Sequence, residues 1–437
     1  MNMQDQLQKL ADAVSALEGS KARARLLQLF DEGTFVEIDR LARDGDKPAE
    51  VAAGYGLVDG SPVYAFAQDR DVCCGAIGRA QGAKIRKVYD LAAQNGAPLV
   101  GIFDSDGAKL GEGIDAMDAI ADILLACNNL SGVVPQIAVV AGACVGSSAI
   151  IASAADIVVA AKDADFYLNP GDENAVPSLV AEDAGEAIEK AKELLRLLPA
   201  NNLAVPVAYE FDSVAMGECE DIHGVIDAVA DTDTVVRLGD GACETALARV
   251  GGAVCGLVTL AEDKLSCCSC GRVARFVRLC DSFSLPVVTF VDAAGFVCLK
   301  GAAKVSQAYA EATTAKITVL VGKAYGPVYI AVAGKSAGAD AVLGWPTASV
   351  LPLAPEAAIH IFWKDRLAAM ENPTEDRKKL AAEYAQTEGS VLNAAAAGTV
   401  TDVIAPADTK GKLIAMLELL SSKRVTRLPK KHANIQL

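Results

Sequence analysis

Residues 85–107 read IRKVYDLAAQNGAPLVGIFDSDG and decide the fold, because residues 273–295 repeat their pattern as VARFVRLCDSFSLPVVTFVDAAG. The two stretches align without a gap, and Asp104 falls on Asp292. Each copy predicts an amphipathic helix, then an apolar strand introduced by a proline, then a turn that contains Asp and Gly. The chain is therefore predicted to contain one α/β unit twice.

A second pair of segments follows the first at nearly the same spacing. Residues 137–146 read IAVVAGACVG and residues 317–326 read ITVLVGKAYG, and both are β-rich runs that end in a Gly-x-x-x-Gly turn before a small-residue helix. Such alternation is typical of helices packed on largely parallel sheets. We predict an N-terminal domain over residues 1–230, with a helical lead-in over 1–33, and a C-terminal domain over 231–437 with a basic tail.

Composition excludes several classes of function. The 437 residues include 40 Lys or Arg and 56 Asp or Glu, a net charge of −16, whereas nucleic-acid binding needs a basic face. The histidines at 223, 360 and 432 have no second ligand at metal-binding spacing. No P-loop occurs. We predict no nucleic acid, no metal, no catalytic triad and no P-loop ATP site.

Two features bear on the compartment. Residues 137–155 are apolar enough to suggest a membrane span, but interrupting Gly and Ser residues favour a strand, a turn and a helix. The chain starts with a polar helical stretch that lacks the apolar core of a signal peptide. Its twelve cysteines are predicted to be cytosolic thiols, and the cluster Cys267, Cys268 and Cys270 to be buried structural thiols.

The two strand-to-helix turns are the remaining candidates for chemistry. Backbone N–H groups at a helix start lack intrahelical acceptors, and the helix dipole adds to their attraction for an anion. At Gly146-Ser147-Ser148 the turn is either an oxyanion hole or only a close packing of strand against helix. Its duplication at residues 326–328 favours the oxyanion hole.

Several stretches occur in the order found in one known family. They are GYGLVDGSPVYAFAQD (54–69), GAPLVGIFDSDGAKLGEGIDA (96–116), SGVVPQIAVVAGACVGSSA (131–149), ARFVRLCDSFSLPVVTFVDAAGF (274–296), KAYGPVYIAVAGKSAGADAVLGWPTA (323–348) and PKKHANIQL (429–437). On these residues, from about Lys21 onward, the chain closely resembles the carboxyltransferase subunits of biotin-dependent acyl-CoA carboxylases and decarboxylases.

The resemblance implies a tandem crotonase-like α/β fold in which an acyl-CoA thioester meets carboxylated biotin in a cleft. It implies one oxyanion hole for the enolate oxygen of the thioester and another for the ureido oxygen of biotin, with no protein nucleophile and no obligatory metal. The residues assigned to catalysis are Gly146, Ser147, Ser148, Gly326 and Val328. Those assigned to binding the CoA thioester or biotin are Gly107, Ala108, Lys109, Gly142 and Tyr325.

The resemblance also implies partners. Since no Ala-Met-Lys-Met biotinyl site occurs, carboxybiotin is expected on a separate biotin carboxyl carrier protein. A biotin carboxylase or a membrane decarboxylase subunit is the expected further partner. The chain itself is expected to be a cytoplasmic homo-oligomer, either a dimer or a hexamer.

The chain departs from the family at four places. The family's common KAYGGAY reads KAYGPVY here, so Pro327 has no N–H to donate. Its Gly-Gly-Ala at the first hole is Gly146-Ser147-Ser148. The Gly-rich loop that helps to build the biotin side is shortened to residues 297–301, and Lys109 stands where the family often has Arg. Lys109 is read equally well as a phosphate contact or as a solvated turn residue.

Four functions remain open on the residues alone. The first is an active carboxyltransferase subunit, including the alpha subunit of a sodium-pumping decarboxylase. A crotonase-type hydratase would need carboxylates beside the hole, for which Glu112 and Asp115 are the candidates. A degenerate scaffold subunit is suggested by Pro327 and the short loop. The fourth is a CoA-ester binding protein without turnover.

Overall fold

The computed structural model divides the chain into two compact units, Met1–Ala204 and Val205–Leu437. It describes residues 3–15, 17, 19–173, 175–239, 241–369, 373–425 and 427–434. The division falls earlier than the predicted boundary near residue 230. The reason is that Ile222, Val225 and Ile226 pack into the core of the second unit.

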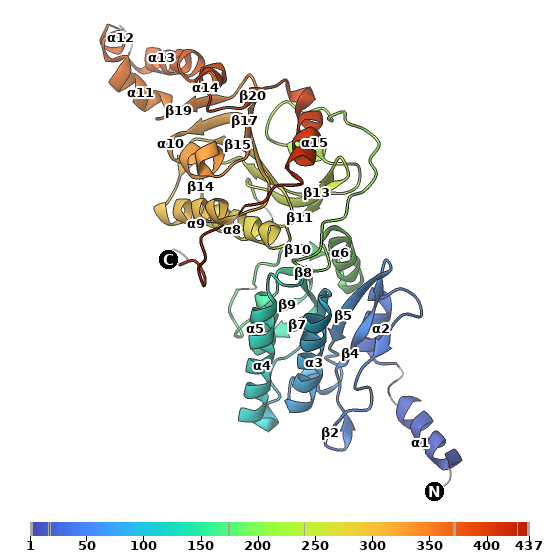
Figure 1. Cartoon of the computed structure of the whole chain (residues 1–437). Helices are drawn as coiled ribbons and strands as arrows, with labels where there is room; N and C mark the ends of the chain where they lie inside the picture. The colour runs from blue at the N-terminus through green and yellow to red at the C-terminus, as the bar shows by residue number, and fades with distance from the viewer. Residues whose placement is uncertain are drawn as a thin grey trace. The chain divides into compact units, whose positions relative to one another are not determined.

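The first unit is built on a mixed sheet with strand order β1-β4-β5-β6-β7-β8-β10 (Figure 1). β4 and β5 form an antiparallel hairpin, and the pairs from β5 to β10 are parallel. The strands of this unit are β1 (Val36–Glu37), β2 (Arg43–Asp44), β3 (Lys47–Pro48), β4 (Ala52–Val58), β5 (Ser61–Ala67), β6 (Leu99–Ser105), β7 (Gln136–Val145), β8 (Ile157–Ala161), β9 (Asp165–Tyr167) and β10 (Leu179–Ala181).

Helices cover this sheet and bury its apolar strands. β6 and β8 are buried along their whole length, as expected for parallel strands between helices. Ile85, Val88 and Ala92 form the apolar face that α3 turns to the core. The helices are α1 (Met3–Ser15), α2 (Lys21–Leu29), η1 (Cys73–Gly75), α3 (Arg79–Asn95), η2 (Leu110–Glu112), α4 (Ile114–Leu130), α5 (Ser147–Ala154) and α6 (Ala184–Leu197).

The second unit repeats the first. Its main sheet has the order β11-β12-β13-β15-β17-β18-β20, which matches the first sheet strand for strand. The predicted duplication is therefore present in three dimensions. The strands are β11 (Val236–Arg237), β12 (Thr245–Val250), β13 (Ala253–Leu260), β14 (Lys264–Leu265), β15 (Val287–Ala293), β16 (Gly295–Phe296), β17 (Lys316–Tyr325), β18 (Ala341–Gly344), β19 (Ser349–Leu351) and β20 (Asp402–Val403).

The helices of the second unit include a C-terminal group that the first unit does not share. α11 and α13 pack together over a small core that contains Tyr325, Leu351 and Tyr384. The helices are α7 (Val225–Val229), α8 (Cys267–Ser282), α9 (Leu299–Glu311), α10 (Gly326–Val328), η3 (Tyr329–Ala333), η4 (Lys335–Ala337), α11 (Pro355–Phe362), α12 (Lys364–Ala368), α13 (Pro373–Thr387), α14 (Val391–Ala396), η5 (Pro406–Asp408) and α15 (Thr409–Leu420).

In each unit the strand that leads to a candidate turn bends into a second, smaller pairing. Beyond residue 142, β7 pairs with β9 through Ala143–Val145. β17 pairs with β19 in the same way through Lys323–Tyr325. The strand, turn and helix predicted for residues 137–155 are confirmed as β7 and α5. Among the helices that the structure describes, none is long and apolar enough to cross a bilayer.

The cysteines differ in part from the prediction. Ten are free thiols, but Cys267 and Cys298 form a disulfide, so the prediction of a thiol is wrong for both. α8 and α9 begin side by side, which brings these two Cα atoms within 6.4 Å. Of the rest of the cluster, Cys270 is buried, as predicted, whereas Cys268 is exposed.

Candidate functional site

The first candidate site lies where β7 ends and α5 begins. Gly146 has φ +60°, which only glycine adopts without strain, and its N–H donates to the Tyr167 carbonyl at 3.1 Å. The N–H of Gly146 is thus already used in a hydrogen bond to the end of β9. Ser147 and Ser148 are the first residues of α5, so their N–H groups have no acceptor within the helix.

A second turn, at residues 105–109, is in contact with this helix start. Ile77 pairs with Ala108 in a parallel bridge, in which the Ile77 N–H donates to the Gly107 carbonyl and the Lys109 N–H to the Ile77 carbonyl. In this pattern the N–H of Ala108 points away from Ile77. A Cβ on Gly107 would lie only 3.5 Å from the Ser147 nitrogen, so the turns touch.

Buried hydroxyls tie the two turns together. The Ser148 hydroxyl donates to the Ser105 hydroxyl at 2.9 Å, and Ser105 Oγ also accepts the N–H of Gly107 at 3.1 Å. The Ser147 hydroxyl is buried and has no hydrogen-bond partner among the described residues. The arrangement therefore fixes the backbone of both turns and leaves the Ser147 side chain uninvolved.

Gly142, which was predicted to contact a ligand, lies against a side chain of its own unit. A Cβ on Gly142 would be 2.4 Å from the Asp104 carboxylate, which accepts the N–H of Ala143 at 3.2 Å. The other carboxylate oxygen accepts from Arg25 at 2.8 Å. The space beside Gly142 is thus filled by Asp104.

Lys109 is held by two carboxylates. Its ammonium group contacts Asp44 and lies 2.9 Å from Glu112. These hydrogen bonds, the one to Asp44 first, raise the pKa of Lys109. One ammonium group between two carboxylates leaves a net negative charge, which disfavours a phosphate here, so Lys109 is a turn residue paired within its own unit and not the solvated residue of the second reading.

The two carboxylates suggested for acid–base chemistry serve α3. Glu112 accepts the backbone N–H of Arg79 at 2.7 Å, and this bond, followed by that of Lys109, lowers the pKa of Glu112. Asp115 lies 3.2 Å from the Arg79 guanidinium. An ionised helix cap is poorly suited to general acid catalysis near neutral pH.

The second candidate site lies where β17 ends and α10 begins. Gly326 has φ +32°, and a Cβ there would be 2.6 Å from the Pro352 carbonyl oxygen. Pro327 follows in the first turn of α10, where a missing N–H breaks no helical bond. Tyr325 and Val328 are buried, and burial raises the pKa of Tyr325.

Phe296 occupies the position of Ala108 in the second unit, and the sequence analysis missed it. Leu265 pairs with Phe296 in parallel, and the Val297 N–H donates to the Leu265 carbonyl at 2.9 Å. The N–H of Phe296 therefore points away from β14, as that of Ala108 points away from Ile77. The signal was present, since extending the repeat alignment by one residue places Phe296 on Ala108.

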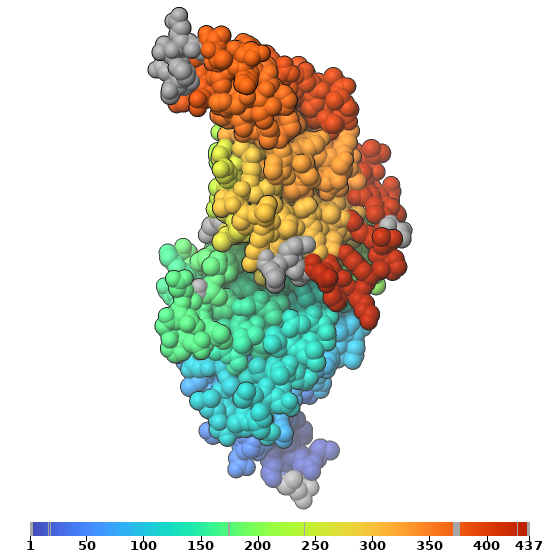
Figure 2. Space-filling view, turned by 90° about the vertical axis from the view of Figure 1, so that its left-hand side faces the viewer, coloured from blue at the N-terminus to red at the C-terminus, as the bar shows by residue number. Residues whose placement is uncertain are grey.

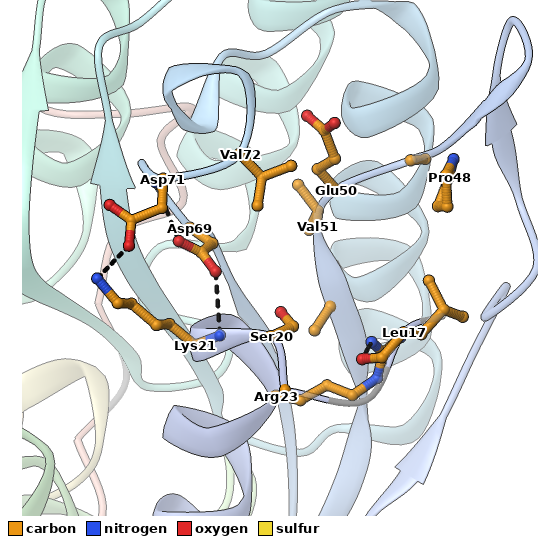
Figure 3. Close-up of a pocket in the computed structure, with 13 residues that line it drawn as sticks. Leu17, Ser20, Lys21, Arg23, Pro48, Glu50, Val51, Asp69, Asp71 and Val72 are labelled. Atoms are coloured by element: carbon orange, nitrogen blue, oxygen red, sulfur yellow. Dashed lines mark hydrogen bonds and ion pairs between the residues drawn. The ribbon is translucent and has the colours of Figure 1, made fainter. Parts of the chain in front are cut away.

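A pocket of about 440 Å³ lies beside the start of α2 (Figure 3). Asp69 accepts the backbone N–H of Lys21 at 3.0 Å, and the Lys21 side chain reaches Asp71. Arg23 is paired with Glu37, outside the lining, at 2.6 Å. With both basic side chains already paired, and Glu50 also lining it, this pocket is not suited to the phosphates of CoA.

No group of His, Cys, Asp or Glu within the described residues has the geometry to hold a metal ion. The candidate sites consist of backbone N–H groups in turns that side-chain carboxylates and hydroxyls hold in place. Such sites stabilise negative charge on a bound oxygen.

Comparison with known proteins identifies the class to which this fold and these turns belong. The model of the carboxyl transferase domain matches residues 18–169 and 171–435. The propionyl-CoA carboxylase beta chain of Saccharopolyspora erythraea is 34% identical over 95% of this chain and 90% of its own. The methylmalonyl-CoA decarboxylase subunit alpha of Veillonella parvula is 33% identical over 95% and 93%.

A solved structure shows the same architecture. Transcarboxylase 12S, described as a hexamer with methylmalonyl-CoA and methylmalonic acid bound, superimposes with a TM-score of 0.92 at 30% identity, over 100% of this chain and 99% of its own. The chain therefore belongs to the carboxyl transferase family. It is a biotin-dependent acyl-CoA carboxyltransferase. The predicted family, tandem crotonase-like fold and carboxyltransferase activity are confirmed.

Proposed function

We propose that the chain moves a carboxyl group between carboxybiotin on a separate carrier protein and an acyl-CoA, using two backbone oxyanion holes. One observation carries the proposal. In each unit, a residue in a parallel bridge points its N–H outward after one strand (β6 or β15), and a helix begins after the next strand of the sheet (β7 or β17). The resulting pairs are Ala108 with Ser147 and Phe296 with Val328. A duplicated donor pair suits a reaction with two oxygen-centred charges.

The first hole is proposed to hold the thioester oxygen of the acyl-CoA. Loss of a proton or of carbon dioxide from the α-carbon moves negative charge onto this oxygen. The N–H groups of Ala108 and Ser147 are fixed before the charge develops, because Ser105 and the Ile77 bridge hold both turns. Fixed donors stabilise the enolate without reorganising at the moment of reaction.

The second hole is proposed to hold the ureido oxygen of biotin. Carboxybiotin supplies the carboxyl group and, through its ring nitrogen, an acceptor for the α-proton. Phe296 and Val328 are the proposed N–H donors, since Pro327 stands at the position equivalent to Ser147 and has none. Gly326 shapes the turn against Pro352.

The direct test is a transfer assay on the purified chain with free biotin. Methylmalonyl-CoA, propionyl-CoA and acetyl-CoA are supplied in turn, with labelled bicarbonate-derived carboxybiotin for the forward direction. Biotin-dependent release of carbon dioxide from methylmalonyl-CoA, or carboxylation of the other two, is expected. Hydration of an enoyl-CoA with no transfer would support the hydratase, and CoA-ester binding without either reaction would support the scaffold or binding protein.

The alpha subunit of an ion-pumping decarboxylase remains the second candidate. It is favoured by the relative from Veillonella parvula, which is a methylmalonyl-CoA decarboxylase subunit alpha. The same transfer chemistry serves both roles, and the partners decide the direction. Copurification from the native host separates them: a biotin carboxylase indicates a carboxylase, whereas a polytopic membrane subunit indicates the decarboxylase.

The proposal requires a separate biotin carboxyl carrier protein. The Ala-Met pairs of the chain are followed by Asp, Gly, Glu and Leu, so no biotinyl-lysine motif occurs. Avidin blotting of the purified chain is expected to be negative while the copurified carrier is positive. A biotinylated band at the mass of this chain would overturn the requirement for a carrier.

We propose that the chain forms a homo-oligomer through apolar surfaces on both units. On the first, Leu110 in η2 and Ile114 and Met117 near the start of α4 are exposed. The part of the chain drawn in cyan, which includes α4, lies on the face of the first unit that Figure 2 turns to the viewer. On the second, Leu299 on α9 and Ile330 on η3 are exposed, and these two elements pack together. Exposed apolar side chains that lie close together are typical of an interface.

The oligomer is expected to appear in light scattering after size exclusion. The double change Ile114→Lys and Met117→Lys should lower the assembled fraction at least tenfold, because an interface does not tolerate two unpaired charges. Leu419→Lys, on the exposed side of α15, serves as the control and should leave the mass unchanged. A monomeric wild type at micromolar concentration would contradict the proposal.

Replacement of Pro327 by glycine tests whether the second turn is impaired or adapted. We expect the transfer rate with biotin to stay the same or to fall, because Pro327 preorganises the first turn of α10 and the strand and helix around it are intact. The measurement is kcat with free biotin at saturating acyl-CoA. A rise of tenfold or more, about 1.4 kcal/mol off the barrier, would instead indicate a weakened hole.

The cytoplasm is the proposed compartment. Ten of the twelve cysteines are free thiols, of which Cys73, Cys74 and Cys268 are exposed, and such thiols persist in reducing compartments. The disulfide between Cys267 and Cys298 is the exception. Alkylation of whole cells before lysis should label Cys73, Cys74 and Cys268, and resistance of these three residues to labelling would count against the cytoplasm.

A further inference from the structure

The strands that lead to the proposed donors share an irregularity. Phe103 pairs with Val140, and the next pair is Ser105 with Cys144. Between these two pairs β6 advances by two residues and β7 by four, which is a β-bulge in β7. β15 and β17 take the same step, again with two residues against four. The step bends the hole-bearing strand away from the main sheet and onto β9 or β19.

An aspartate lies at the centre of each step. Asp104 falls between the two register pairs on β6, and its carboxylate accepts the N–H of Ala143 at 3.2 Å. Asp292 falls between the pairs on β15 and accepts the N–H of Lys323 at 2.8 Å. In the bulge, the N–H of Ala143 or Lys323 lies outside the regular pairs with the neighbouring strand, and the carboxylate supplies its acceptor.

Glycine makes room for both carboxylates. A Cβ on Gly142 would lie 2.4 Å from an oxygen of Asp104, and a Cβ on Gly322 would lie 2.4 Å from an oxygen of Asp292. Real side chains do not tolerate such a distance. The same arrangement of an aspartate, a glycine and a backbone N–H that the aspartate accepts is therefore present in both units.

The two aspartates differ in charge compensation. Asp104 is 7% exposed and is paired with Arg25 at 2.8 Å. Asp292 is partly exposed, and it forms no ion pair within the described residues. Lys323, whose N–H it accepts, points its ammonium group to Asp263 instead. A change at Asp292 therefore disturbs the hydrogen bond to the strand without leaving a partly buried arginine such as Arg25 unpaired.

We infer that Asp104 and Asp292 are positioning residues, each of which holds the bulge that aims the following helix start at its oxyanion. Ala143 lies four residues before Ser147, and Lys323 lies five before Val328. Release of the carboxylate frees a short span of backbone that ends at a proposed donor. The inference rests on the proposed function of the two holes. It adds that Asp104 and Asp292 hold the turns that carry the proposed N–H donors.

Asp292 offers the cleaner test. Asp292→Leu removes the acceptor at similar volume, whereas Asp292→Asn keeps an oxygen acceptor and removes only the charge. We expect exchange of the amides of Lys323, of residues 324–326 and of Val328 to quicken at least tenfold in the Leu variant and to stay near wild type in the Asn variant. In the same samples, kcat with free biotin should fall at least tenfold for Leu, with little change in KM for acyl-CoA.

Gly322→Ala supplies an independent route to the same state if the Leu variant does not fold. Its Cβ would push the Asp292 carboxylate out of the bulge while the aspartate remains. The expected exchange pattern is that of Asp292→Leu. Faster exchange confined to Lys323, or an Asn variant as damaged as Leu, would overturn the inference. Amide exchange needs no substrate, so a wild type without transfer activity would count against the proposed function and leave this readout intact.

Discussion

Replacing Ser147 by proline is expected to lower the rate of carboxyl transfer by about 10²–10³-fold, the loss found when one donor of an oxyanion hole is removed. Ser147 is the first residue of α5, a position where proline fits and breaks no helical hydrogen bond. The chain itself carries a proline at the equivalent position, Pro327. The substitution therefore deletes one N–H group and little else. The measurement is kcat with acyl-CoA and free biotin at saturation.

Ser147→Ala is the matched control because it keeps the N–H and removes only a hydroxyl that has no partner among the described residues. It should retain the rate of the wild type. Thermal unfolding within a few degrees of the wild type would show that both variants are folded. Equal rates for the proline and alanine variants would remove Ser147 from the first hole and leave Ser148 as the helix-start donor to examine.

Most of the helices and strands could be predicted from the periodic pattern of apolar residues in the sequence. The helix that ends near residue 95 and the strand that follows Pro98 were predicted from local periodicity, and the gapless repeat doubled each inference. The turn after Val145 was predicted because glycine and small residues between a strand and a helix leave few alternatives. These features depend on neighbours in the chain, which the sequence displays directly.

Contacts between distant residues could not be predicted in the same way. Lys109 was read as a phosphate contact or a solvated turn residue, and neither reading anticipated its ion pair with Asp44, which lies in β2. Gly142 was assigned to binding the CoA thioester or biotin, and the assignment did not anticipate the carboxylate of Asp104 that fills the space beside it. The partner of Cys267 depends on two helices starting side by side. In each case the deciding atom is supplied by tertiary packing.

The direction of a backbone N–H is the other quantity that sequence does not supply. Ala108 was predicted to contact the ligands, but its proposed role as a donor follows only from the bridge to Ile77, which turns its N–H outward. Phe296 was missed because its large apolar side chain gives no sign of a donor role, although its backbone is equivalent to that of Ala108. Catalysis by backbone groups leaves no side-chain signature at these positions.

Replacing Gly326 by alanine is expected to lower the rate of transfer from biotin by about 10²-fold, which is the low end of the loss for a damaged oxyanion hole. Its φ of +32° disfavours any side chain, and the added Cβ would lie 2.6 Å from the Pro352 carbonyl oxygen. Backbone strain alone costs about 1–3 kcal/mol, and relief of the clash must move the turn that carries Val328. The measurement is kcat with free biotin, beside KM for acyl-CoA.

Gly146→Ala measures the effect of backbone strain without a steric clash such as that between the Cβ at residue 326 and the Pro352 carbonyl. Gly146 also has a positive φ, of +60°, but a Cβ there would meet nothing closer than the Leu168 carbonyl at 4.0 Å. This variant should therefore lose less activity than Gly326→Ala, because its turn need not move. Gly271→Ala, on α8 with no atom near the added Cβ, controls for expression and folding. If Gly146→Ala and Gly326→Ala lose activity equally, the clash with Pro352 does not shape the second hole, and the donor role of Val328 loses its structural basis.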